Sequence, residues 1–233
     1  TAPISLRFVV GDMRGADRDI EILDALAQEL RLPAHSYTVA RFRMCRAAGS
    51  GQLPEARELL QQVMRLGREA GDGGIAWVVG PIGLFLLSLD ATPESIRHGL
   101  GAITSQAHME GPTADAFAAH FCMTVDDRAG CAARLENAVG HGFERIPRNE
   151  DWLWSLGLLG DVCVYLRDKP RCTQLYTLLK PYEHLNVVSR TCSYRGFMGS
   201  VLGRLAMVLG DLEAARAHLE YAIEFNRKLG APL

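Results

Sequence analysis

One short pattern occurs twice in this chain, and the two copies are separated by 159 residues. It reads GQLPEAR from Gly51 and GDLEAAR from Gly210, and both copies continue to a leucine, an arginine and a glycine at matching positions. A shared offset over so many positions indicates an internal repeat. Repeat proteins usually bind over an extended surface, so the pattern favours a binding role over chemistry at one point.

Weaker copies extend the repeat over the chain, with turns at positions 11, 51, 91, 126, 167 and 210. A small residue usually stands five positions after the turn and a large apolar residue nine positions after it. The small residue lets one helix approach its neighbour, and the large one lies on the same helical face and fills the gap. In chain order the two positions hold Ala16 and Ile20, Ala56 and Leu60, Ile96 and Leu100, Cys131 and Leu135, Cys172 and Tyr176, and Ala215 and Leu219.

The segments between these turns have helical periodicity. From Ala56 to Leu66, apolar residues recur at intervals of three and four. Residues typical of helix starts and ends stand near the turns: Pro33, Pro54, Pro93 and Pro170 at starts, Gly71 and Gly230 at ends. No segment alternates strictly, so no sheet is expected. The sequence predicts an all-α fold in which residues 1–233 form one domain of about six antiparallel helix pairs.

Leu202-Gly203, Gly210-Asp211 and Ala215 form one helix-pair pattern, and Leu159-Gly160, Asp168 and Cys172 form a looser copy of it. Both resemble the tetratricopeptide helix-pair signature. The longer repeat length, with PRNEDWL from Pro147, GDVC from Gly160 and LYTLLKPY from Leu175, is similar to the arrays of large bacterial ATP-dependent regulators of the maltose-activator type. The resemblance implies a right-handed α-solenoid in a longer parent chain, either a transcriptional regulator or a nucleotide cyclase-type signalling protein, with the ATPase and the output domain elsewhere in that chain.

Two functions follow as hypotheses. The first is a non-catalytic module of such a regulator, which binds a protein or peptide segment or a small effector and contributes to signal transduction or transcription regulation. The second is a stand-alone helical-repeat protein with a ligand-carrying or catalytic role in a biosynthetic pathway. A P-loop encoded upstream in the full-length transcript would favour the first. The terminal segments lack a distinctive polar cap, which indicates a piece of a longer array, although short natural arrays also exist.

Composition and charge exclude several classes. The formal net charge of −2 and the pI near 6.4 give no basic field for direct nucleic-acid binding. The amino terminus has no secretory signal pattern, and the most apolar stretch, residues 75–89, is too short for a membrane span and contains Pro81. That stretch is expected to be a buried, kinked helix. A cytoplasmic, reducing location is therefore expected.

Motifs for cofactors, metals and catalysis are absent from the sequence. It has no P-loop, dinucleotide fingerprint or nucleophile elbow, so neither ATP turnover nor a cofactor is expected. The six cysteines form no Cys-x-x-Cys pair and the seven histidines are scattered singly, so no metal site is expected. Cys131 and Cys172 are expected in the core. Glu150 and Asp151 are expected in the first turn of a helix, where they favour its dipole.

In tetratricopeptide arrays the first helix of each unit lines the concave side, so the resemblance implies a concave groove lined by these helices, and the repeat register assigns residues to it. A groove that mixes aromatic and charged residues suits a peptide, a protein segment or a small effector. Trp154 and Arg204 are the strongest candidates for binding anchors, since tryptophan and arginine commonly dominate recognition surfaces. The alternative is that the aromatic residues pack between helices. The candidate groove residues are Arg41, Phe85, His120, Trp154, Asp161, Phe197 and Arg204.

Overall fold

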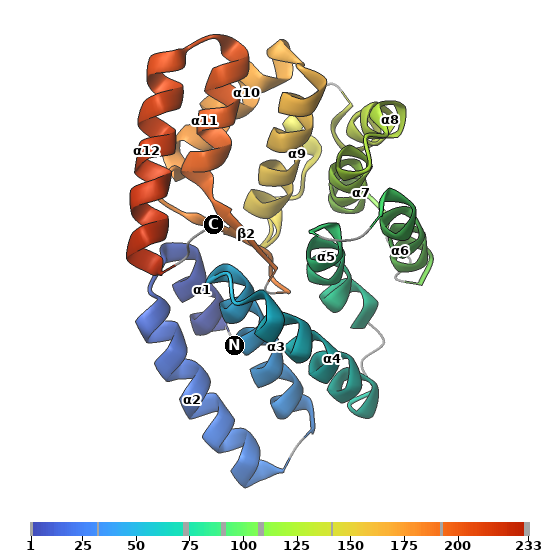
Figure 1. Cartoon of the computed structure of the whole chain (residues 1–233), viewed down its shortest axis with the longest axis vertical. Coiled ribbons are helices and arrows are strands. Elements are labelled where there is room, and N and C mark those ends of the chain that lie inside the picture. The colour runs from blue at the N-terminus through green and yellow to red at the C-terminus, as the bar shows by residue number, and fades with distance from the viewer. Residues whose placement is uncertain are drawn as a thin grey trace.

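The computed structural model describes residues 2–31, 33–71, 75–89, 92–106, 110–140, 142–191 and 193–230. These residues are predominantly helical, as the sequence predicts (Figure 1). Their α-helices are α1 (Ala2–Val10), α2 (Met13–Leu30), α3 (Pro33–Gly49), α4 (Leu53–Glu69), α5 (Ile75–Ser88), α6 (Pro93–Gln106), α7 (Pro112–Thr124), α8 (Arg128–Val139), α9 (Trp152–Leu166), α10 (Lys169–Leu179), α11 (Met198–Leu209) and α12 (Leu212–Leu229).

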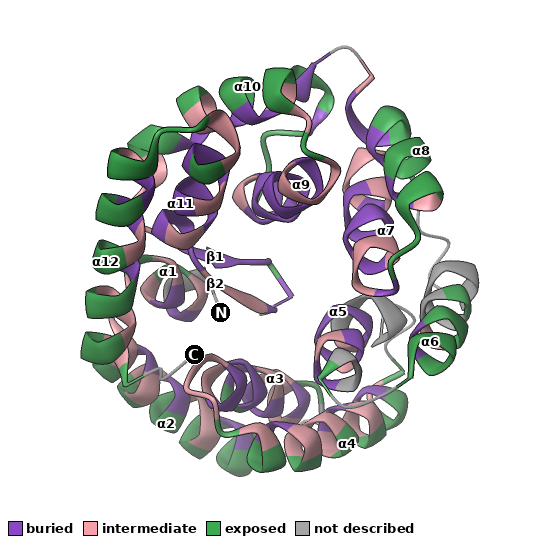
Figure 2. Cartoon of the chain, turned by 45° about the horizontal axis from the view of Figure 1, so that its top comes forward, coloured by how far each residue is buried: buried purple, intermediate pink, exposed green. Residues whose placement is uncertain are grey.

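The helices form two concentric layers. Figure 2 shows the odd-numbered helices on the inside, largely buried, and the even-numbered helices around them with exposed outer faces. The most extensive contacts join α3 to α4, α7 to α8 and α11 to α12. Among the inner helices, α9 contacts both α7 and α11. The inner helices therefore surround a common central region.

The predicted turns at positions 11, 51, 126, 167 and 210 are confirmed, whereas position 91 lies outside the described residues. Each of these turns begins with a residue in the left-handed region, with φ between 56° and 88°. In four of them the next residue is an aspartate whose carboxylate accepts the backbone N–H three positions later, as an N-cap does. These caps are Asp12, Asp127, Asp168 and Asp211, while Gln52 makes no such bond.

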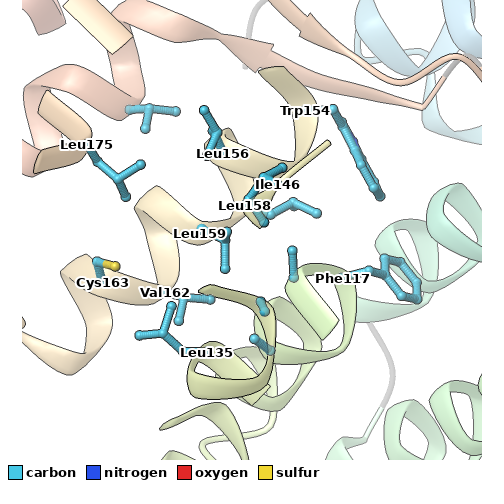
Figure 3. Packing of buried hydrophobic residues seen from close by; sticks show 14 of the residues in the cluster. Phe117, Leu135, Ile146, Trp154, Leu156, Leu158, Leu159, Val162, Cys163 and Leu175 are labelled. Atoms are coloured by element: carbon cyan, nitrogen blue, oxygen red, sulfur yellow. The ribbon is translucent and has the colours of Figure 1, made fainter. Parts of the chain in front are cut away.

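The small residues of the repeat pack where expected. Ala56, Cys131 and Cys172 are fully buried, and Ala215 is 3% exposed. A Cβ at Gly203 would lie 2.6 Å from Leu219 Cγ, so glycine allows α11 to approach α12 closely. The largest apolar cluster extends from Leu84 to Leu205 and centres on α9 (Figure 3).

A two-stranded antiparallel sheet corrects the expectation of a sheet-free fold. Strands β1 (Asn186–Val188) and β2 (Tyr194–Phe197) pair Asn186 with Phe197, with a register irregularity after Val187. Three-residue and four-residue strands are too short for a visible alternation of apolar and polar residues, which is why the pattern search misses them. The hairpin lies between α10 and α11 in the chain, after the 3-10 turn η2 (Lys180–Tyr182).

The hairpin reaches back to the beginning of the chain. Asn186 Nδ2 donates to the carbonyl oxygen of Phe8 in α1 over 2.8 Å, and Tyr194 Oη donates to Asn186 Oδ1. The end of α12 also lies against the first turn, because a Cβ at Gly11 would be 2.9 Å from Phe225. The last unit therefore contacts the first, and the hairpin lies inside the inner layer (Figures 1 and 2).

The start of α9 differs from the sequence prediction. Glu150 and Asp151 precede α9 rather than occupying its first turn, and Asp151 is held by Arg190, whose backbone N–H and guanidinium both contact the carboxylate. The contact with the hairpin, rather than the helix dipole, sets the position of Asp151.

In α5, Ile82, Leu84 and Leu86 are buried, as expected for this apolar stretch. Among the described helices, none is both long and apolar enough to cross a bilayer.

Candidate functional site

Residues of α3, α5, α7, α9, α11 and α12, together with β2 of the hairpin, line an open cavity of about 820 Å³. A cavity of this size is typical of small-molecule sites. Its walls are largely apolar, with a few polar groups on α9, β2 and α11. The apolar side chains include Phe85, Leu89, Met123, Phe197, Leu219 and Ile223, and the charged ones are Asp161, Arg195 and Arg204.

A buried carboxylate organises the polar wall. Asp161 is 6% exposed, and its two oxygens accept from different arginines. Arg195 of β2 donates to Oδ2 over 2.5 Å, and Arg204 of α11 donates its Nε to Oδ1 over 2.9 Å. Burial alone would raise the pKa of Asp161, but the positive charges of Arg204 and Arg195 outweigh it and hold the pKa below the usual value. Asp161 is therefore ionised and links three elements.

His120 lies next to this cluster and is uncharged near neutral pH. Its side chain is buried on α7 and meets the ring of Phe121 edge-on at 5.5 Å between centroids. Burial, and then the positive charge of Arg195, lower the pKa of His120 to about 3. His120 therefore offers one N–H donor and one acceptor nitrogen rather than a positive charge.

A second, much smaller cavity of about 30 Å³ adjoins the first and shares Phe85, Tyr194 and Arg195 with it. We call it the side chamber. Its apolar wall includes Phe117 and Trp154, whose rings are stacked with centroids 6.2 Å apart (Figure 3). Its polar residues are His120, Ser193 and Arg195. Within the described part of the chain, His120 Nδ1, Ser193 Oγ and Arg195 Nε are buried without a hydrogen-bond partner.

The structure brings six of the seven candidate residues around these two cavities. Phe85, Asp161, Phe197 and Arg204 line the large cavity, and Phe85, His120 and Trp154 line the side chamber. Arg41 does not join them. It lines another cavity, of about 410 Å³, whose wall includes Val188 at the end of β1 and Arg190 just after that strand. The expected single continuous groove is thus divided, because the hairpin occupies its middle.

The aromatic candidates differ in how much surface they offer. Trp154 is 3% exposed and Phe197 is 1% exposed, stacked on Phe225 at 4.0 Å between ring centroids. These two residues fit the packing alternative, since an almost fully buried ring has little surface for a partner. Phe85 is half-buried and Arg204 retains 38% side-chain exposure. Arg204 therefore remains accessible for binding, whereas Trp154 does not.

Sequence reasoning missed the hairpin contributions, above all Ser193, Tyr194 and Arg195. A weak signal was present: the interval between turns 167 and 210 is the longest of the repeat. Because α10 has only 11 residues and α11 only 12, the rest of that interval forms the connection that carries the hairpin. Repeat insertions of this kind map to loops on one face and are often part of the binding face.

Comparison with known proteins yields no significant match to a family model, a curated protein or a solved structure. Among the described residues, no group of three or more histidine, cysteine, aspartate or glutamate side chains could hold a metal ion.

Proposed function

We propose that this chain is a non-catalytic effector-sensing module, in which about six antiparallel helix pairs form a right-handed α-solenoid around a binding cavity. The single observation that carries the proposal is the cavity of about 820 Å³ lined by side chains of α3, α5, α7, α9, α11 and α12. A ligand in this cavity contacts several repeats at once. Its binding energy then depends on how the repeats are placed relative to one another, which is the requirement for a ligand to shift a conformational equilibrium.

A small effector fits this cavity better than an extended peptide. The hairpin fills the middle of the inner layer, and Tyr194, Arg195 and Gly196 of β2 form part of the cavity wall. A peptide that follows the inner surface over several units would have to displace the hairpin and its hydrogen bond from Asn186 to Phe8. A compact ligand needs no such displacement.

The parent protein in this proposal is a bacterial ATP-dependent regulator, on the strength of the resemblance to the long tetratricopeptide-like arrays. The ATPase and the output domain then lie elsewhere in the parent chain. The module itself acts in the cytoplasm, without membrane insertion, direct nucleic-acid binding, a cofactor or nucleotide turnover. Upstream coding sequence with a P-loop supports this parent, and ATP hydrolysis by the purified chain contradicts it.

A second candidate is a stand-alone helical-repeat protein that carries a ligand in a biosynthetic pathway. The contact between the end of α12 and Gly11, which joins the last unit to the first, favours this alternative. When the last unit packs against the first, the ring of helices is complete without neighbouring domains. The two candidates share the cavity and differ in whether ligand binding is transmitted to another domain.

The cavity is tested with a panel of small molecules and a blocking variant. Ser200 lines the cavity from α11, and Ser200→Trp places a large ring inside it. Compounds that raise the melting temperature of the wild-type chain are expected to lose that effect in Ser200→Trp and keep it in Ala217→Trp, because Ala217 is exposed on α12. If every active compound stabilises both variants equally, the cavity is not the effector site.

A further inference from the structure

We infer that the ligand of the large cavity is an amphipathic monocarboxylate, whose acid group enters the side chamber at Arg195, Ser193 and His120 while its apolar part occupies the large cavity. This inference rests on the proposed function, since it names the class of effector. It is carried by the charge balance of the walls, the unpartnered polar atoms of the side chamber and the difference in size between the two cavities.

The charge balance favours an anion. The charged side chains that line the two cavities are one carboxylate, Asp161, and two guanidiniums, Arg195 and Arg204. His120 adds no charge, because its pKa is lowered to about 3. The walls thus carry one excess positive charge, which is hydrated where Arg195 and Arg204 are exposed. An apolar ligand would remove that water without replacing it, whereas an anionic ligand compensates the charge it desolvates.

The side chamber offers a matching set of hydrogen-bonding atoms. Arg195 Nε–H can only donate, and the Ser193 hydroxyl and one tautomer of His120 also donate to a carboxylate. His120 and Ser193 are each 6% exposed, so their unpartnered atoms lie away from bulk solvent. Buried polar atoms without partners are costly, and a ligand that supplies acceptors relieves that cost. Three such groups in the lining of one small chamber are enough to fix the orientation of one acid group.

Size distinguishes a carboxylate from a larger anion. The side chamber encloses only about 30 Å³, which is room for the oxygens of one planar acid group or for ordered water. A tetrahedral phosphate, with more oxygens spread in three dimensions, needs more room than a planar carboxylate. The adjoining large cavity is lined by Phe85, Leu89, Met123, Leu219 and Ile223, which suits an alkyl or aryl chain. The headgroup and the apolar chain of the ligand therefore occupy different cavities, the side chamber and the large cavity.

The inference is tested by calorimetric titration with three probes of equal chain length: decanoate, decanol and decyl phosphate. Decanoate is expected to bind to the wild-type chain at least about tenfold more tightly than decanol, because the alcohol leaves the positive charge uncompensated. Decyl phosphate is expected to bind more weakly than decanoate. Equal binding of decanol, or tighter binding of decyl phosphate, overturns the assignment.

Two variants test where the carboxylate headgroup binds. Arg195→Met is expected to lower decanoate affinity at least about tenfold and to abolish the preference over decanol. Arg216→Met is the matched control, since Arg216 is 78% exposed on α12 and pairs only with Glu220 among the described residues. Ser193→Ala is the milder second variant and keeps the test decisive if Arg195→Met does not fold. Unchanged decanoate binding in Ser193→Ala and in any folded Arg195→Met protein overturns the headgroup site.

Failure of this inference is distinguishable from failure of the proposed function. If none of the three probes binds while other compounds stabilise the chain and Ser200→Trp prevents it, the cavity remains an effector site and the monocarboxylate class is wrong. If a crystal structure with decanoate shows only water bridging His120, Ser193 and Arg195, the side chamber is a hydration site and the inference fails.

Discussion

The two connections that flank α11 differ in whether their structure depends on nearby or on distant residues. The turn after it, Gly210-Asp211, repeats a local geometry found at four other places in the chain. The connection before it, residues 180–197, contains a 3-10 turn and the hairpin, and is held by contacts with α1 at the other end of the chain. The first depends on neighbours within a few residues, and the second on residues about 180 positions away. Local geometry leaves a sequence pattern, and distant contacts do not.

The distribution of buried polar groups follows the same division. In the described part of the chain, every buried polar or charged residue lies at position 120 or later, and most belong to the hairpin or to helix residues that face it. The earlier units are packed with alanine, aliphatic and aromatic side chains, the last including Phe8 and Phe42. The earlier units therefore fit a structural role, while the later ones supply the chemistry of the cavity.

The largest expected effect concerns Asp161, the buried carboxylate of α9 that pairs with Arg195 of the hairpin and Arg204 of α11. Asp161→Asn leaves Arg195 and Arg204 without their counter-charge, and is expected to lower the free energy of unfolding by about 3 kcal/mol. The estimate is at the low end for a buried pair because the two arginines remain 27% and 38% exposed. Urea unfolding monitored by circular dichroism measures it.

The matched control for that variant is Asp24→Asn. Asp24 pairs with Arg43 between α2 and α3, and both side chains are more exposed than Asp161. An exposed pair of this kind contributes below about 1 kcal/mol. Equal losses in the two variants would show that the Asp161 cluster is no more important for stability than an ordinary surface pair.

The next effect tests the repeat register. Ala215 is 3% exposed, and its carbonyl lies only 3.3 Å from where a Cβ at Gly203 would stand. Ala215→Leu is therefore expected to overpack α12 against α11 and to cost about 1–3 kcal/mol, measured by thermal or urea unfolding. Ala217→Leu, on the exposed face of α12, serves as the control. A variant at Ala215 that melts like the wild type would contradict the assigned register.

The third prediction is a pH dependence set by His120. The unfolded chain binds a proton at His120 below the ordinary pKa of 6.5, while the folded protein does not bind it until about pH 3. Between these values the unfolded state holds more protons, so the free energy of unfolding falls as pH falls, by up to about 1.4 kcal/mol per unit. His120→Gln is expected to remove that part of the slope between pH 6.5 and 5.

Urea unfolding at pH 7.5, 6.5 and 5 measures the slope for each protein. His184→Gln is the control, because His184 is exposed in the turn after η2. Its slope is expected to match the wild type. If His120→Gln and the wild type show the same slope, His120 is not held neutral by its burial.

Local features of this fold can be predicted from the sequence, whereas contacts between distant segments cannot. The turns at 11, 51, 126, 167 and 210 and the burial of Cys131 and Cys172 follow from local rules of capping and close packing. Asp161 and Arg204 are candidates because they hold matching positions in the repeat register, and the structure joins them in one ion pair. Arg195 and Ser193 cannot be found this way, since their positions depend on the pairing of two short strands. The register also assigns Arg41 to the same groove, because a repeat register carries no information about an insertion that divides it.

The smallest expected effect is also the sharpest test of the repeated turn. Gln52 has φ −79° and ψ 65°, close to the −80° and 70° of Asp12 and the −86° and 82° of Asp211. The backbone at Gln52 is therefore already arranged for a capping side chain, but the side chain of Gln52 makes no cap bond. Gln52→Asp is expected to supply the bond to the N–H of Glu55 and to stabilise the protein by about 0.5–1 kcal/mol. The gain is limited because the bond between Gln52 and Ser50 is lost and Glu55 adds a nearby negative charge.

Asp211→Ala is the reciprocal variant and should destabilise the protein by about 1 kcal/mol. If removal at 211 is costly while addition at 52 has no effect, the turns share a backbone shape without sharing its energetics.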